Sequence, residues 1–498
     1  MEFLTRITVQ GLSILSTLFV LAIGFGVLLI VIMFLIDANQ SKNAVRRNFP
    51  VVGRFRDLFA RLGEFFRQYF FALDREEMPF NRAERDWIYT SAAGEDNTQP
   101  FGSTRSLNIV GTPIFANAPF PILEETNDSP ELTFGEGCAQ PYRIRQLINI
   151  SGMSYGALSK PAIQSLSRGA KLAGCWLNTG EGGLSPYHLE GGCDIIFQIG
   201  TAKYGVRDEN GEFSVEKYRE VTGHPEVKMT ELKLAQGAKP GKGGLLPASK
   251  VTSEIADVRG IPEGEDSVSP NRHPEIDSVD DLLDFIVRLR EISGKPVGIK
   301  TVVSSKRWLD EFCKGINARG PESAPDFITV DGGDGGTGAA PMALMDNVGL
   351  TLREALPMLV DALREHGLRQ RIKVIASGKL AVPAEVAWAY CTGADAVNTA
   401  RGFMFSIGCI QAMACNTNNC PTGITTHKPH LQDGIVPETK AKSVAFYVKR
   451  MEKDVEMIAH SCGVEHARFL RRSHVRIVQA NGRSVPMDDL YPEMEDLR

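Results

Sequence analysis

The stretch FITVDGGDGGTG, residues 327–338, joins a short apolar run to a glycine-rich loop. Such a run is typical of a buried parallel strand, and glycine lets the loop that follows approach a ligand closely. Amphipathic segments such as 279–292 and 352–366 separate further runs of this kind. Because strand and helix alternate over eight units, the sequence predicts an α/β fold, a (β/α)8 TIM barrel. The predicted strands are Leu147–Ile150, Cys175–Thr179, Ile195–Ile199, Val227–Leu234, Pro296–Val302, Phe327–Asp331, Lys373–Ser377 and Ala396–Thr399.

The glycine-rich sequences cluster where the predicted strands end. They follow the first, second, fourth and sixth strands, at residues 151–156, 178–183, 236–244 and 331–338. Barrel enzymes carry their active sites at the carboxyl ends of the strands, so these loops predict one shared site. The stretch 236–277, rich in glycine, proline and charge, is predicted to be a functional loop inserted after the fourth strand.

The loops after the last two strands are predicted to hold a phosphate group. They contain Ser377-Gly378-Lys379 and Thr399-Ala400-Arg401-Gly402, which offer backbone N–H groups, a hydroxyl and two cations. A planar cofactor that ends in phosphate, such as FMN, fits this position in a barrel. A competing dinucleotide motif at 333–338 lacks the acidic residue that should end the next strand. The residues expected to contact the cofactor are Met153, Ser154, Gly332, Gly335, Gly336, Ser377, Gly378, Thr399, Arg401 and Gly402.

Residues 12–36 form an uncharged apolar run of 25 residues. A helix of about 20 residues crosses the ~30 Å core of a bilayer, whereas the apolar part of a signal peptide has only about 7–15. The run therefore predicts an uncleaved anchor within residues 1–40, with a signal peptide as the alternative. Arg6 precedes it, and seven basic residues follow it up to Arg67. By the positive-inside rule, the chain crosses the cell inner membrane once and its catalytic body lies in the cytoplasm.

A basic and aromatic extension, residues 41–104, follows the anchor. Its segment 64–71 reads EFFRQYFF. This segment is predicted either to lie along lipid headgroups as an interfacial helix or to pack its aromatic side chains on the barrel. The composition of the segment leaves both alternatives open.

The overall charge and the cysteines indicate which partners and ligands the protein binds. The net charge of −5 argues against a nucleic-acid partner, because a phosphate backbone attracts a basic surface. Nine cysteines are scattered along the chain, and three of them, Cys409, Cys415 and Cys420, lie close together in sequence. In a reducing compartment such a group favours metal or cluster ligation over disulfides, with buried thiols as the alternative.

Six motifs resemble, in order and spacing, the FMN-binding synthase domain of glutamate synthases. They are ISGMSYGALSKPAI (150–163), LNTGEGG (177–183), LAQGAKPGKGG (234–244), VGIK (297–300), DGGDGGTGAAP (331–341) and CNTNNCPTG (415–423). The resemblance covers residues 105–430 and implies bound FMN. It also implies that the three cysteines, spaced C-x5-C-x4-C, hold a 3Fe–4S cluster or a 4Fe–4S cluster with one open site.

The resemblance also implies roles for individual side chains. Lys300 matches the family's active-site lysine, which would support the reduced flavin and bind a substrate carboxylate. Glu181, Gln236 and Lys239 lie in motifs that line the family's 2-oxoglutarate pocket. Among these, Glu181 is a second candidate catalytic residue, which would orient an imine nitrogen or act as acid and base. Asp331 is expected either to contact the substrate or to hold loops together.

The chain also departs from the larger glutamate synthases. The amidotransferase domain with its nucleophilic cysteine is not seen, and residues 431–498 are expected to form a mostly helical tail in place of a β-helix domain. The sequence is in this respect similar to the stand-alone FMN-binding glutamate synthases. Nitrogen is expected from an ammonia-supplying partner, free ammonia or an amine, and electrons from a ferredoxin-like donor or a separate reductase.

The predicted reaction is the reductive amination of 2-oxoglutarate, or a related 2-oxo acid, to an amino acid. One alternative is a membrane-associated FMN dehydrogenase that passes electrons from a hydroxy or amino acid to quinone. The sequence shows no paired histidine and arginine near the last strands for such an oxidation. A further alternative is a non-catalytic, flavin-binding scaffold at the membrane.

Overall fold

The computed structural model describes residues 2–40, 44–123 and 130–492. The chain forms two compact units, of which the first reaches Ala83 and the second begins at Glu84. The smaller unit contains the apolar N-terminal run, and the larger one contains all eight predicted strands.

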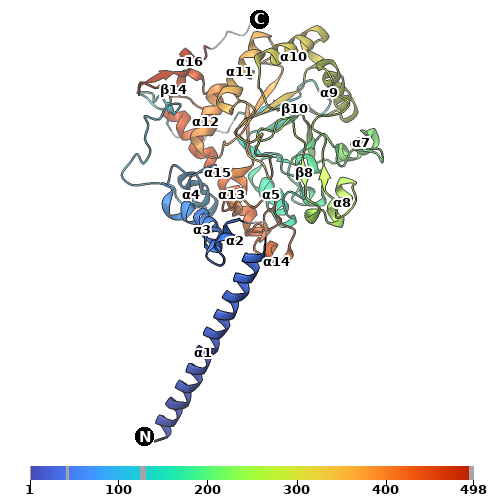
Figure 1. The fold of residues 1–498 in the computed structure, drawn as a ribbon. Helices are drawn as coiled ribbons and strands as arrows, with labels where there is room; N and C mark the ends of the chain where they lie inside the picture. Colours follow the sequence, from blue (N-terminus) through green and yellow to red (C-terminus); the bar gives the residue numbers. More distant parts are fainter. Residues whose placement is uncertain (1, 41–43, 124–129, 493–498) are drawn as a thin grey trace. The chain divides into compact units, whose positions relative to one another are not determined.

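The N-terminal unit is built on one long helix, α1 (Glu2–Asn39) (Figure 1). Its residues 8–39 are long and apolar enough to cross a membrane, and they contain the predicted apolar run. A signal sequence near the N-terminus can pass the same test of length and composition, so both predicted alternatives stay open for this helix. Two shorter helices and a π-helical turn follow: α2 (Ala44–Asn48), α3 (Gly53–Phe66) and η1 (Arg67–Phe71).

The larger unit contains the predicted barrel. Eight parallel strands close into a ring, since the last strand, β13, pairs with the first, β4. Every predicted strand is confirmed, with ends that differ by at most two residues. The barrel strands are β4 (Ile148–Ile150), β5 (Leu177–Asn178), β6 (Ile195–Ile199), β7 (Val227–Lys233), β10 (Val297–Thr301), β11 (Phe327–Asp331), β12 (Lys373–Ser377) and β13 (Ala396–Thr399).

The barrel strands form where residues are buried on both faces. In β6 and β11 all five residues are buried, which matches the continuous apolar runs of parallel strands. At the N-terminal ends of the strands, a hairpin of β2 (Leu132–Phe134) and β3 (Tyr142–Ile144) packs on the barrel. Phe134 makes edge-to-face contacts with Trp176 at 5.8 Å and with Phe327 at 5.7 Å. Burial of each ring contributes roughly 1.5–3 kcal/mol to stability. Because the hairpin covers the N-terminal ends of the strands, it closes the end of the barrel opposite the predicted site.

Helices alternate with the strands, as the amphipathic segments predict. The two helices α9 (Val279–Ser293) and α11 (Leu352–Glu365) confirm those predictions to within one residue. Helix α9 begins with a capping box, in which Ser278 and Asp281 each accept the other's backbone N–H. The remaining helices before the tail are α4 (Arg82–Ala93), α5 (Lys160–Ala173), α6 (Pro186–Leu189), α7 (Val215–Gly223), α8 (Ser253–Arg259), α10 (Lys306–Arg319), α12 (Pro383–Thr392), α13 (Arg401–Ser406) and α14 (Pro429–Gln432).

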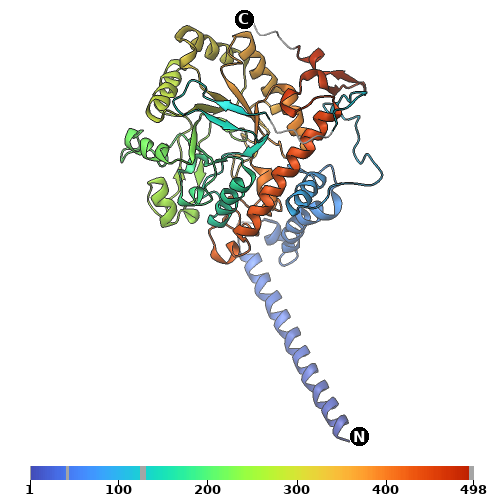
Figure 2. The ribbon, with the colours of Figure 1, turned by 180° about the vertical axis from the view of Figure 1, so that it is seen from behind.

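Helix α15 (Pro437–Ser461) belongs to the barrel wall, although the sequence analysis places it in the C-terminal tail. It packs against α5 and α12, which follow the first and seventh barrel strands, and so takes the position of the eighth helix (Figure 2). Tyr447 on α15 is buried and donates its hydroxyl to the Ala381 carbonyl at 3.0 Å. Beyond α15 lies a small antiparallel sheet that the sequence analysis does not predict. In it β14 (Val475–Val478) pairs with β1 (Pro113–Phe115) and β15 (Ser484–Pro486), and helix α16 (Met487–Leu490) follows.

The segment 236–277 follows the fourth barrel strand, β7, as predicted. It contains helix α8 and two short strands, β8 (Leu245–Leu246) and β9 (Ser267–Val268), which pair antiparallel. Arg259 at the end of α8 donates to the Tyr155 carbonyl at 3.3 Å, in the loop after β4. The insertion therefore lies against the carboxyl ends of the strands, where it can line a site.

Candidate active site

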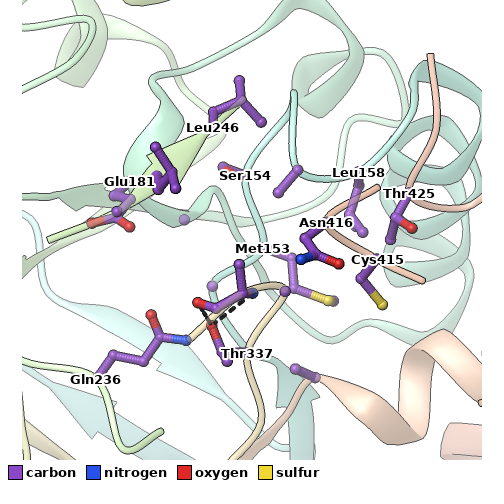
Figure 3. Close-up of a pocket in the computed structure, with 18 of the residues that line it drawn as sticks. Met153, Ser154, Leu158, Glu181, Gln236, Leu246, Thr337, Cys415, Asn416 and Thr425 are labelled. Carbon is purple, nitrogen blue, oxygen red and sulfur yellow. Dashed lines mark hydrogen bonds between the residues drawn. The ribbon is translucent and has the colours of Figure 1, made fainter. Parts of the chain in front are cut away.

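A cavity opens at the carboxyl ends of the barrel strands, where the sequence predicts the site (Figure 3). Its empty space, including the part open to solvent, is about 1020 Å³. Figure 3 shows Glu181 at one end, Cys415 and Asn416 at the other, and Met153 between them. The predicted site residues that line the cavity are Met153, Ser154, Glu181, Gln236, Lys239, Gly336, Arg401 and Cys415.

Glu181 lies on the short turn η2 (Gly180–Gly182) that follows β5. Its carboxylate is 3.1 Å from the ammonium of Lys233, the last residue of β7. Lys233 also donates to the side-chain oxygen of Gln236 at 3.1 Å. Burial alone would raise the pKa of Glu181, but Lys233 and two further cations of the cavity lower it below its ordinary value. Glu181 therefore remains an anion, suited to accept hydrogen bonds from a bound nitrogen.

Three cations surround this carboxylate: Lys233, Lys239 and Arg259. Lys239 is buried, and burial together with Lys233 lowers its pKa, against the attraction of Glu181. Arg259 donates to Ser267 Oγ at 3.2 Å, and its buried Nε has no partner among the described residues. The surplus of positive charge suits a small carboxylic acid.

The predicted catalytic residue Lys300 is not among the residues that line the cavity. Its buried ammonium lies 3.3 Å from Asp331, which also accepts from Ser377 Oγ at 3.1 Å and from Gly237 N at 3.0 Å. Burial would lower the pKa of Lys300, but Asp331 and Glu231 raise it above its ordinary value. The contacts of Asp331 support loop holding, one of the two roles that the sequence leaves open. Contact between Lys300 and a flavin stays a prediction.

Sequence reasoning missed Lys233 and the polar network next to it on β7. Glu231 is buried inside the barrel and accepts hydrogen bonds from Asn178 (2.8 Å), Gln198 (2.6 Å) and Thr329 (2.5 Å). Since Gln198 lines the cavity, this network fixes part of the cavity floor. The signal that could have found these residues is the ELK sequence at 231–233, with two charges inside an otherwise buried strand. The arginine that ends α8 was also missed, and no local pattern marks it.

The predicted phosphate loops are held largely by contacts within the protein. Arg401 lines the cavity, donates to the Thr337 carbonyl, and has its other terminal nitrogen 3.8 Å from Cys415 Sγ. Gly402 packs closely against Tyr447. A Cβ at this glycine would lie only 2.1 Å from the tyrosine hydroxyl. All of the predicted cofactor contacts stay predictions, and six of the predicted residues do not line the cavity. These residues are Gly332, Gly335, Ser377, Gly378, Thr399 and Gly402.

The three clustered cysteines lie together at the Cys415 end of the cavity. Cys409 and Cys420 are buried. Burial, together with the nearby Cys415 and Cys420, raises the pKa of Cys409. Burial would raise the pKa of Cys420 as well, yet hydrogen bonds with two nearby threonines lower it below its ordinary value. A lowered pKa favours the thiolate, which is the form that binds metal.

Ligation of an iron–sulfur cluster by the three cysteines stays a prediction, and two cations lie near Cys415. In the part of the chain that the structure describes, no three His, Cys, Asp or Glu side chains are placed to hold one metal ion. Lys250 is buried and donates to the Cys415 carbonyl at 2.9 Å, and Arg401 approaches the Cys415 sulfur. Cations beside thiolates stabilise the negative charge of a cluster.

The chain is similar in sequence to proteins of one family. Residues 117–465 match the family model described as the conserved region in glutamate synthase. The chain is 38% identical over 508 residues to the glutamate synthase large subunit-like protein YerD of Bacillus subtilis, covering 94% of this chain and 96% of that protein. It is 36% identical over 332 residues to the archaeal glutamate synthase (NADPH) of Methanocaldococcus jannaschii, covering 66% of this chain and 61% of that protein. The chain thus spans about three fifths of this archaeal relative. Among solved structures, mandelate oxidase with 2-hydroxy-phenylacetamide matches 80% of this chain and 97% of that one, at a TM-score of 0.45 and 14% identity.

Proposed function

Because the chain belongs to the family that shares the conserved region of glutamate synthase, we propose that it is an FMN- and iron–sulfur-dependent oxidoreductase. Its proposed reaction is the reductive amination of 2-oxoglutarate, or a related 2-oxo acid, to an amino acid. The charge of the cavity carries this proposal, since three cations surround one carboxylate. A dicarboxylic oxo acid would neutralise the surplus positive charge.

The cations and the carboxylate have distinct roles in this proposal. Arg259 and Lys239 would each supply a positive charge to attract a carboxylate of the substrate. Glu181 would accept a hydrogen bond from the incoming nitrogen and hold it near the carbonyl carbon of the substrate. Lys233 holds Glu181 in its ionised form, so Glu181 acts as an acceptor or base rather than as a proton donor at neutral pH.

Each proposed cofactor would have its own set of residues. FMN would be held by Met153, Ser154, Gly336 and Arg401, and when bound it would supply hydride transfer. The three clustered cysteines would hold the iron–sulfur cluster, which supplies one-electron transfer. Lys300, which pairs with Asp331, would support the reduced flavin and bind a substrate carboxylate.

The supply of nitrogen and electrons, and the location of the protein, complete the proposal. Nitrogen would come from an ammonia-supplying partner, free ammonia or an amine, and electrons from a ferredoxin-like donor or a separate reductase. Helix α1 would anchor the protein in the cell inner membrane by a single span, with the catalytic unit in the cytoplasm. The arginines of α2 and α3, which follow this helix, support the orientation.

The cofactors are tested with full-length protein purified in detergent, by visible absorption before and after anaerobic reduction with dithionite. Flavin bands over a broad iron–sulfur shoulder are expected. Cys415→Ser should remove the shoulder and keep the flavin bands. Cys462→Ser, which changes a buried cysteine next to the end of α15, is the matched control and should keep both. A colourless protein that FMN and iron cannot reconstitute would favour a scaffold without catalysis.

The reaction is tested by the glutamate formed from 2-oxoglutarate and ammonia with chemically reduced protein. Lys239→Met should lose this activity, whereas Lys242→Met, which changes an exposed lysine three residues away, should retain it. A second candidate is the FMN dehydrogenase that reduces quinone, which the long apolar helix α1 favours. Oxidation of a hydroxy or amino acid with a quinone analogue, without activity on 2-oxoglutarate, would select that candidate.

A further inference from the structure

Helix α3 carries an apolar stripe that is exposed. Its five residues are spaced i, i+3, i+4, i+7 and i+11, which places them on one face of the helix. Their exposed fractions range from 37% to 64%. A stripe of this kind normally faces a core, so its exposure marks a surface for a partner. The residues of this α3 stripe are Phe55, Leu58, Phe59, Leu62 and Phe66.

The apolar surface continues into η1. Tyr69, Phe70 and Phe71 are exposed there as well. The ring of Phe66 lies 5.5 Å from that of Phe70 and 6.2 Å from that of Phe71, so the stripe and the turn form one surface. Exposed aromatic rings next to arginines are typical of the boundary between a bilayer and water. These rings suit the interfacial alternative that the sequence predicts for 64–71.

An ion pair places the start of α3 at the end of α1. Arg54 donates from Nε and Nη2 to the two carboxylate oxygens of Asp37, each at 2.8 Å, and the Val51 N–H donates to Asp37 at 3.0 Å. Asp37 directly follows Ile36, the last residue of the apolar run. Figure 1 shows α2 and α3 beside this end of α1. The α3 stripe therefore begins at the level where a membrane-spanning α1 leaves the bilayer core.

The charges around the stripe favour an anionic surface. Arg46 on α2 pairs with Asp57, which is the one acidic side chain that the structure describes between residues 45 and 71. Further arginines are exposed in α2, α3 and η1, and cationic side chains at this level attract anionic lipid headgroups. They are Arg47, Arg56, Arg61 and Arg67.

We propose that α3 and η1 lie in the headgroup region of an anionic bilayer, with the α3 stripe toward the acyl chains and the arginines toward the phosphates. This surface goes beyond the proposed reaction, and it rests on the proposed anchoring of the protein by α1. Together, the anchor and the interfacial helix hold the first unit to the membrane at two places. A second copy of the chain is the other occupant that the test must separate from lipid.

The test uses the full-length protein reconstituted in vesicles of phosphatidylcholine and phosphatidylglycerol. Two variants add a tryptophan on opposite faces of α3: Phe59→Trp in the stripe and Ala60→Trp on the polar face. Quenching by lipids brominated near the headgroup is compared between them, since the four native tryptophans are common to both. The expected quenching of the added tryptophan is at least twofold greater for Phe59→Trp. Replacing phosphatidylglycerol by phosphatidylcholine should reduce this difference.

Three outcomes would overturn the proposal, and they can be told apart. Equal quenching of both variants, in protein that floats with the vesicles, would leave the anchor intact but remove α3 from the interface. Protein that does not float with the vesicles would overturn the anchor and the interfacial helix together. A blue-shifted but unquenched Phe59→Trp emission that depends on the protein density in the vesicles would show that a second copy covers the stripe.

Discussion

Lys233 Nζ lies 3.1 Å from Glu181 Oε1, and this ion pair joins the end of β7 to the turn after β5. The strand between them, β6, ends in Ile199 and is followed by Gly200. A Cβ at Gly200 would lie 2.5 Å from Glu181 Cβ, so the carboxylate reaches Lys233 only because this position has no side chain. The pair fixes both the charge and the position of Glu181 in the cavity.

Replacing Glu181 by glutamine keeps its size and removes its charge. We expect kcat for the proposed amination to fall by roughly 10²-fold or more, because the acceptor for the substrate nitrogen loses its negative charge. Flavin absorption should be unchanged. Steady-state kinetics on Glu181→Gln beside the wild-type protein measures this effect, and an unchanged kcat would remove Glu181 from the reaction.

Gly200→Ala should disturb the ion pair between Glu181 and Lys233. The added methyl group collides with Glu181 and displaces it from Lys233, so kcat should fall by at least tenfold, and overpacking should destabilise the fold by about 1–3 kcal/mol. Gly137→Ala is the matched control, since a Cβ there has no atom within 4 Å. Equal kinetics of the two variants would show that the position of Glu181 does not matter.

Asp331→Asn should destabilise the protein, because it leaves the buried Lys300 without its charged partner. Breaking a buried ion pair of this kind typically reduces the free energy of unfolding by about 3–5 kcal/mol. The double variant Lys300→Met/Asp331→Asn should recover part of that loss in thermal melts, because it removes the unpaired charge and keeps a hydrogen-bond acceptor at position 331. Additive effects of the two single changes would mean that Lys300 and Asp331 do not interact.

Glu452→Gln should stabilise the protein at alkaline pH. Burial raises the pKa of Glu452 from 4.5 to about 7, so the folded state binds a proton that the unfolded state releases. Stability is therefore lost as pH rises through this window, and the charged carboxylate opposes folding above it. Glutamine preserves the acceptor for the Leu147 N–H without the charge. Melting temperatures should rise by several degrees at pH 8 and remain unchanged below pH 5, whereas an increase at both values would point to a cause other than titration.

The architecture follows from local patterns in the sequence. The eight strands and the helices α9 and α11 lie where apolar runs and amphipathic periods predict them, because burial on one or both faces acts over a few neighbouring residues. The apolar run inside α1 is found for the same reason. The glycine-rich strand ends also locate the site, since barrel strands carry their loops to one end.

The composition of the site was predicted only in part. Glu181, Gln236 and Lys239 line the cavity as expected, and Asp331 holds loops, one of the two roles considered. Lys233, which lies at the end of strand β7, was not among the predicted site residues. The surroundings of residues 64–71 could be predicted only as two alternatives, lipid headgroups or the barrel, because exposure of an aromatic residue cannot be read from its identity.

Local sequence patterns are enough to predict a barrel with a long apolar helix and a site at the carboxyl ends of its strands. Other features appear only in the folded chain: Arg259 acts on the charge of Glu181, α15 is the eighth barrel helix, and β1 pairs with β14. The difference lies in the range of the interactions. Strand and helix patterns reflect neighbours in the chain, whereas these contacts join residues tens to hundreds of positions apart, and packing of the whole fold selects them.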